Sequence, residues 1–186
     1  MIPPHRSGAK PCAGRYLLLA SLMMAAWTAG PVRAEPTARD LQVLARALSF
    51  LDPPPVGSVE VGIVYPPHSA PARAEADRII AAFGDGLRAG NLTLRARPVQ
   101  VDTVAQAGTM ALLLTEAAAP QAAAVAAAVA GRSVLILAFD RSLVDTGAVA
   151  MVVRSEPRVE ILVNRAAAQA ARIKFMAAFR MMIQER

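Results

Sequence analysis

Cysteine is almost absent from this sequence. The only one among 186 residues is Cys12, which precedes the first apolar run in a segment that we expect to be cleaved off. The remaining chain would have no cysteine, which excludes a disulfide framework and any cysteine-ligated metal site. It would also keep one histidine, His68, with no cluster of carboxylates in the sequence beside it. We therefore predict no metal site and no cofactor.

Aromatic residues and net charge are also low. Aromatics make up 4% of the chain, too few for a surface that stacks on bases. The sequence has 20 Lys and Arg against 14 Asp and Glu. Four of the cations and none of the acids lie in residues 1–34: Arg6, Lys10, Arg15 and Arg33. The rest of the chain therefore has 16 cations against 14 acids, a net charge of +2, which disfavours a nucleic-acid-binding function.

Glycine is missing from the segment after the first expected strand, where nucleotide-binding proteins carry a phosphate-binding loop. That segment is PPHSAPA, residues 66–72, which disfavours a dinucleotide or Walker-type site. Ser69, His68 and Asp140 could supply the side chains of a catalytic triad, but the sequence has no Gly-x-Ser-x-Gly elbow to present the serine. We predict that the protein is not an enzyme and assign no catalytic residue.

The N-terminal segment has the layout of a secretory signal peptide. A positive region precedes an apolar run from Tyr16 to Trp27, and Val32 and Ala34 suit the positions before a cleavage site. The apolar run is shorter than the roughly 20 residues that span a membrane. We expect a cleaved signal over residues 1–34, a mature chain that begins at Glu35, and a location in the periplasm; the alternative is an uncleaved N-terminal anchor.

Residues 35–186 are expected to form a single α/β domain, because strand patterns alternate with helix patterns. Thr37 is a good N-cap for a first helix that carries a leucine stripe, and Pro53 to Pro55 end that helix. The strands are expected at residues 59–65, 92–101, 110–115 and 133–138, and two further helices at 71–83 and 120–130. The β-α-β order predicts a three-layer sandwich with a mainly parallel sheet.

The last quarter of the chain is expected to form a β-hairpin that leads into a closing helix. The strands would cover residues 148–153 and 159–163, with Ser155, Glu156 and Pro157 at the turn, so that the sheet gains an antiparallel edge. Asn164 is a suitable N-cap for the helix. Apolar residues then recur at helical spacing through the rest of the chain, at Ile173, Met176, Phe179, Met182 and Ile183.

Candidate ligand-binding residues lie where the expected strands end, because ligands of open α/β sheets bind at the carboxyl ends of the strands. They are Tyr65, Asp140 and Ser142. Asp140 has an alternative role, which is to cap the following turn together with Ser142.

Two surfaces are candidates for binding a partner protein. The first is the leucine stripe of the N-terminal helix, Leu41, Leu44 and Leu48, which could lie in a partner's groove or could instead pack against this chain's own sheet. The second is the hairpin turn, which Arg154 and Arg158 flank. The alternative for these arginines is that they are solvated charges that protect a sheet edge.

The segment VLILAFDRSLVDTGAVAMVVRSEPRVEILVNRAAAQAARIKF resembles the C-terminal half of the YfiR/HmsC-like family of periplasmic proteins. The matching features are a hydrophobic strand that ends near Asp140, a glycine at Gly147, and a strand pair that ends at Asn164. The chain departs from the family in two respects. Many members carry cysteines that this mature chain lacks, so disulfide-linked control would be absent, and the stretch from Phe50 to Pro54 is only loosely similar.

This resemblance implies a non-enzymatic regulator that binds and restrains a membrane-bound signalling protein, such as a diguanylate cyclase or a similar inner-membrane sensor. The expected partner is the periplasmic domain of that sensor, and a homodimer is possible. The alternative is a single-lobe solute-binding module, because the β-α-β order and VGIVYPPHSAPA resemble one lobe of periplasmic substrate-binding proteins.

Overall fold

The computed structural model describes residues 36–186 of the chain. The expected signal peptide and its cleavage site lie outside the described residues. Among the residues that are described, no helix is both long enough and apolar enough to cross a membrane.

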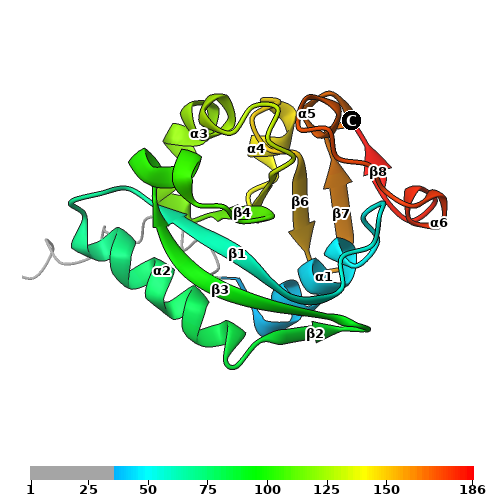
Figure 1. The fold of residues 1–186 in the computed structure, drawn as a ribbon, viewed down its shortest axis with the longest axis horizontal. Helices are drawn as coiled ribbons and strands as arrows, with labels where there is room; N and C mark the ends of the chain where they lie inside the picture. Colours follow the sequence, from blue (N-terminus) through cyan, green and yellow to red (C-terminus); the bar gives the residue numbers. More distant parts are fainter. Residues whose placement is uncertain (1–35) are drawn as a thin grey trace, which may run out of the picture. The chain divides into compact units, whose positions relative to one another are not determined.

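One mixed sheet runs through the described part of the chain, with the strands in the order β2-β3-β1-β4-β5-β6-β7-β8 (Figure 1). Strands β3, β1, β4, β5 and β6 run parallel to one another, whereas β2 pairs antiparallel with β3 and β7 pairs antiparallel with β6. The strands are β1 (Gly57–Tyr65), β2 (Leu87–Ala89), β3 (Leu92–Gln100), β4 (Ala111–Leu114), β5 (Leu135–Ala138), β6 (Met151–Arg154), β7 (Glu160–Val163) and β8 (Gln184–Glu185). The mainly parallel sheet and the hairpin of β6 and β7 are confirmed.

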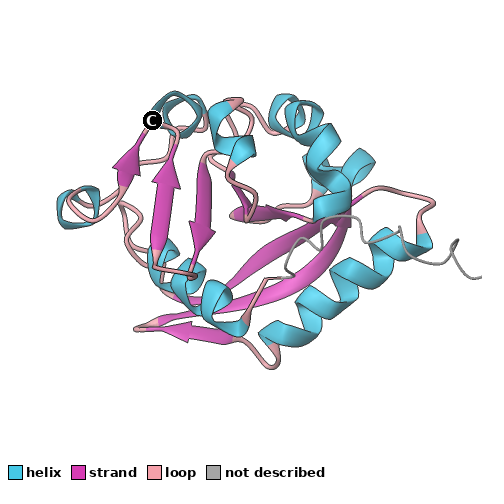
Figure 2. Cartoon of the chain, turned by 180° about the vertical axis from the view of Figure 1, so that it is seen from behind, coloured by secondary structure: helices cyan, strands magenta, loops and turns pink. Residues whose placement is uncertain are grey.

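Helices cover both faces of the sheet, which makes the predicted three layers (Figures 1 and 2). They are α1 (Ala38–Leu48), α2 (Ala70–Phe83), α3 (Ala122–Ala128), α4 (Ser142–Asp145), α5 (Arg165–Ala170) and α6 (Ala177–Arg180), with 3-10 helices η1 (Val101–Gln106) and η2 (Glu116–Gln121). Side chains alternate between two cores along each central strand: Leu113 and Leu137 face α1 and α2, while Leu112 and Ile136 face α3. Strands buried on both faces explain the unbroken apolar runs of the sequence.

The leucine stripe of α1 packs into the core. Leu41, Leu44 and Leu48 are all 0% exposed, and they lie in the same apolar cluster as α2 and the central strands. The hypothesis that these leucines bind a partner is therefore corrected, because none of them has surface to offer. An amphipathic helix with one apolar stripe buries it wherever its own sheet has an uncovered face.

The single closing helix predicted from Asn164 to Met182 is wrong. Asn164 does cap a helix, accepting the N–H of Ala167 at 2.8 Å, but this helix, α5, ends at Ala170. Arg172 then adopts a left-handed conformation with φ of 56°, and the chain runs extended past Leu51. The one-turn helix α6 follows, and β8 pairs in parallel with β7.

Candidate functional site

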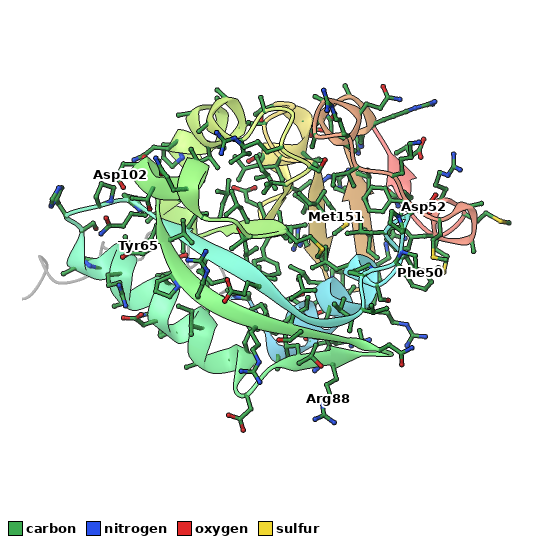
Figure 3. All side chains as sticks on the ribbon, in the orientation of Figure 1. Phe50, Asp52, Tyr65, Arg88, Asp102 and Met151 are labelled. Atoms are coloured by element: carbon green, nitrogen blue, oxygen red, sulfur yellow. The ribbon has the colours of Figure 1, made fainter. Side chains whose placement is uncertain are left out.

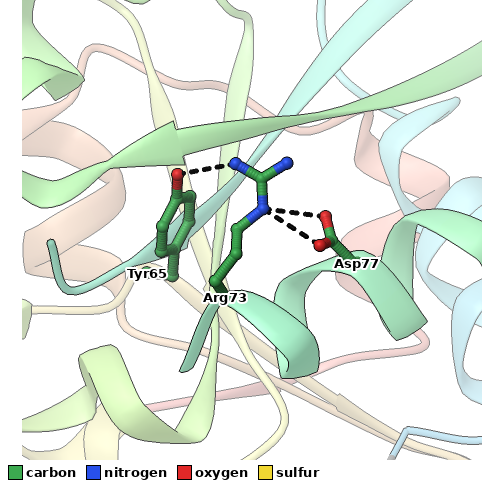
Figure 4. A network of polar contacts seen from close by, with 3 residues as sticks. All are labelled: Tyr65, Arg73 and Asp77. Carbon is green, nitrogen blue, oxygen red and sulfur yellow. Dashed lines mark hydrogen bonds and ion pairs between the residues drawn. The ribbon is translucent and has the colours of Figure 1, made fainter. Parts of the chain in front are cut away.

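The carboxyl end of β1 carries a polar network built on Arg73 of α2 (Figure 4). Its guanidinium donates to the Tyr65 hydroxyl at 2.9 Å and to both carboxylate oxygens of Asp77, one helical turn away, at 2.9 and 3.0 Å. The guanidinium also lies 5.3 Å from the centroid of the Tyr65 ring. Tyr65 is buried, so the predicted ligand-binding tyrosine already has a partner for its hydroxyl inside the protein.

The neighbouring end of β4 is tied to the same helix. Glu75 of α2 accepts the backbone N–H groups of Glu116 and Ala117 at 2.6 and 3.3 Å, which satisfies free donors at the start of η2. The Thr115 hydroxyl donates to the carbonyl of Val64 on β1 at 2.8 Å and accepts from Ala118 N–H at 3.2 Å. The strand ends β1 and β4 are therefore held together by internal hydrogen bonds.

Asp140 follows β5, and its carboxylate caps the next turn. One oxygen accepts both the backbone N–H and the hydroxyl of Ser142, at 2.9 and 2.8 Å. The capping interpretation of this pair is confirmed. Strand β4 lies between β1 and β5 in the sheet, so Tyr65 is two strands away from Asp140. A shared ligand site for Tyr65, Asp140 and Ser142 stays a prediction.

His68 is exposed in the loop after β1 and has a positive φ of 60°. Over the described residues, the structure brings together no group of three His, Cys, Asp or Glu side chains that could hold a metal ion.

The turn between β6 and β7 joins Arg154 to Arg158, and both arginines are exposed. Ser155, between them, is 1% exposed, and its backbone N–H donates to the carboxylate of Asp40 at 2.6 Å. The other Asp40 oxygen accepts the backbone N–H and the hydroxyl of Thr37, at 2.7 and 2.8 Å. Asp40 thus completes a capping box on α1 and also fixes the start of the hairpin turn.

Burial by itself would raise the pKa of Asp40, but the hydrogen bonds from Thr37 and Ser155 outweigh it and hold the pKa below its ordinary value of 3.8. The sequence did not indicate Asp40 as a candidate functional residue. The T-x-x-D spacing from Thr37 could have identified its role as a cap, whereas its contact with Ser155, 115 residues away, has no local signal.

We expect Asp40→Asn to lower the free energy of unfolding by roughly 1–2 kcal/mol at neutral pH, because an amide replaces a charged acceptor of several hydrogen bonds. Because the folded-state pKa of Asp40 is lowered, the loss of stability in this variant depends on pH. The stabilisation by the carboxylate is complete above its unfolded-state pKa and is lost as pH falls through the lower folded-state value. Denaturant unfolding of both proteins at several pH values measures this difference.

The matched control for that experiment is Asp77→Asn, which breaks an exposed ion pair with Arg73 on α2. Exposed pairs contribute little, so its effect should stay below about 1 kcal/mol. A deficit of Asp40→Asn that persists undiminished in acid would contradict the role of the carboxylate charge.

A family model described as YfiR/HmsC-like matches residues 71–181, which begin at the second residue of α2 and include every element from β2 to α6. The chain belongs to the YfiR/HmsC-like family. The expected family resemblance is confirmed, and the matched residues include the segment after Ser133 that carries its motifs. A comparison with curated proteins finds no match.

The solved structures with a similar fold include two that each match most of this chain. One is described as the ABC domain in complex with L-Trp from Streptococcus pneumonia, with 11% identity, and the other as a conserved domain protein from Vibrio cholerae, with 13% identity. Each gives a TM-score of 0.53 and covers 81% of this chain. The chain spans 60% of the length of each structure. At this level of identity the likeness extends to the fold alone.

Proposed function

We propose that this YfiR/HmsC-like protein is a periplasmic, non-enzymatic regulator that binds and restrains a membrane-bound diguanylate cyclase or a similar sensor. The observation that carries the proposal is the family match over residues 71–181. The signal-like segment before Glu35 supports export to the periplasm.

The hairpin turn is our proposed contact surface for that sensor. Arg154 and Arg158 project two exposed guanidinium groups, which bind carboxylates in a fixed geometry. The turn between them is anchored, because Ser155 is buried and bonded to Asp40. An anchored turn loses little conformational entropy when it binds, so its charges are presented at low cost.

The test combines partner capture with a cellular readout. Tagged protein is crosslinked in intact envelopes and purified, and the sensor that co-purifies is identified. The double variant Arg154→Glu and Arg158→Glu should reduce its recovery about tenfold or more, because like charges now face the partner's acids. Deletion of the gene should raise the cellular level of cyclic di-GMP, and the double variant should fail to lower it again.

Arg88→Glu is the matched control, because Arg88 is an exposed arginine on β2 at the far edge of the sheet. It should leave recovery of the sensor unchanged. Normal recovery with the hairpin variant would remove the turn as the interface, and an unchanged cyclic di-GMP level after deletion would contradict the regulatory function.

A single-lobe solute-binding module is the second candidate, supported by the fold likeness to the domain from Streptococcus pneumonia, whose description names L-Trp. This chain spans 60% of that structure, so a ligand held between two lobes would have only part of its site here. A neighbouring gene for a membrane cyclase or histidine kinase would favour the regulator, and genes for a permease with its ATPase would favour the module.

A further inference from the structure

The C-terminal segment of the chain is rich in cations. Residues 164–184 contain four basic residues and no Asp or Glu. They are Arg165, Arg172, Lys174 and Arg180, and all four are exposed. Within the part of the chain that the structure describes, no ion pair involves any of them. The four positive charges of this segment are therefore accessible from solvent.

Two phenylalanines anchor this segment and determine which side chains face outwards. Phe175 and Phe179 are buried, and Phe179 stacks on Phe50 with ring centroids 5.1 Å apart. Around Phe175 the chain is extended, and Met176 N–H donates to the carbonyl of Phe50 at 2.9 Å. Because side chains alternate along extended backbone, Lys174 and Met176 point away from the core that Phe175 enters.

Exposed methionines accompany these cations. Met181 is 89% exposed, Met182 60% and Met176 38%, and they belong to the few large apolar side chains that the described residues leave in solvent. They surround α6, which stands beside β8 at the outer edge of the sheet in both views (Figures 1 and 2). Two acids lie near them: Glu185 on β8, and Asp52, whose backbone N–H bonds to the carbonyl of Lys174 and which Figure 3 places next to Phe50. Arg172, Lys174 and Arg180 outnumber these two acids. Positive charge therefore prevails around the methionines.

We propose that residues 172–182 dock on an anionic phospholipid surface. Arg172, Lys174 and Arg180 would bind lipid phosphates, and Met181 and Met182 would enter the boundary between headgroups and acyl chains. Exposed apolar side chains in the same short segment as exposed cations suit this interface, because the bilayer supplies both an apolar layer and a dense array of negative charges. Methionine is long and flexible, so it adapts to a fluid surface. The inference does not require that the protein partner be a cyclase.

The experiment measures co-sedimentation of residues 35–186 with vesicles, since the compact unit of the structure spans Glu35–Arg186 and the apolar N-terminal segment would bind lipid by itself. Vesicles of phosphatidylcholine with and without phosphatidylglycerol are the probes. The chain should bind only the anionic vesicles, and high salt should release it. Lys174→Gln with Arg180→Gln should weaken binding about 25-fold, roughly fivefold for each charge. Met181→Ser with Met182→Ser should weaken it by at least about fivefold.

The control is Arg88→Gln with Arg95→Gln, which removes two exposed arginines at the opposite edge of the sheet and should leave binding unchanged. The substituted side chains of the C-terminal pairs are exposed, so circular dichroism and melting should match the wild type. The proposal is overturned if anionic vesicles do not bind the chain, or if the control pair weakens binding as much as the C-terminal pairs. It is also overturned if the C-terminal pairs abolish capture of a protein partner and leave vesicle binding intact.

Discussion

Phe179→Ala should lower the free energy of unfolding by about 3–5 kcal/mol, the range for deletion of a buried phenylalanine ring. Phe179 is 1% exposed and lies between Phe50, at 5.1 Å, and Phe175, at 5.4 Å between ring centroids. Alanine would leave a cavity beneath the C-terminal segment and remove both ring contacts. A domain has about 5–15 kcal/mol of stability in total, so the variant should melt far below the wild type and accumulate poorly.

Met181→Ala is the control for this prediction. It removes a large side chain two residues further on, but that side chain is 89% exposed, so the change should stay within about 0.5 kcal/mol. Urea unfolding followed by circular dichroism measures both variants. If Phe179→Ala unfolded at the wild-type urea concentration, the C-terminal segment would have to be detachable from the core.

The apolar spacing indicated that Phe179 would be buried, but it did not reveal the path of the backbone. Helix α5 ends in a Schellman motif, in which Ile173 N–H bonds to Ala168 and Arg172 N–H bonds to Gln169. The left-handed position of this motif is usually glycine, and here it is Arg172. The sequence has no glycine or proline here to mark the end of the helix. The spacing of the apolar residues therefore predicts one continuous helix. The extended pairing with Leu51 and the addition of β8 to β7 are long-range contacts that local spacing does not encode.

The capping residues of the candidate site could be predicted from the sequence. Residue type and position predict Asn164 as a cap and give capping as one of two roles for Asp140, and the structure shows the capping hydrogen bonds of both. The contacts that hold the site together over long distances in sequence were missed, such as Glu75 with Glu116 and Asp40 with Ser155. A carboxylate that binds backbone N–H groups 41 and 42 residues away looks the same in sequence as a solvated one.

The short strands β2 and β8 escaped prediction for a related reason. They have three and two residues, too few for an alternating pattern to emerge. Each pairs with an edge of the sheet core, where β3 and β7 would otherwise expose unpaired backbone groups. The predicted strands have a clearer signal: β1 and β3 have nine residues each, and β4 and β5 are buried along their whole length.

Leu44→Asp should unfold the domain. Leu44 is 0% exposed within the apolar cluster beneath α1, and none of the buried residues in the described part of the chain is basic. An aspartate there either buries an unpaired charge or takes up a proton and still lacks hydrogen-bond partners, and each outcome costs several kcal/mol. Together with the lost leucine packing, about 2–5 kcal/mol, the penalty approaches the whole stability of a domain. Circular dichroism and the yield of folded protein report the result.

Gln42→Asp makes the comparison specific, because it introduces the same charge on the same helix at an exposed position. This control should melt within a few degrees of the wild type, since surface substitutions change stability by about 0.5 kcal/mol or less. Partner capture is measured beside stability. If Leu44→Asp kept the wild-type melting temperature and lost only its partner, α1 would leave the sheet at little cost and its leucines would form a docking surface. Loss of folding in Leu44→Asp alone would show that the leucine stripe is core and would leave the hairpin turn as the proposed contact surface.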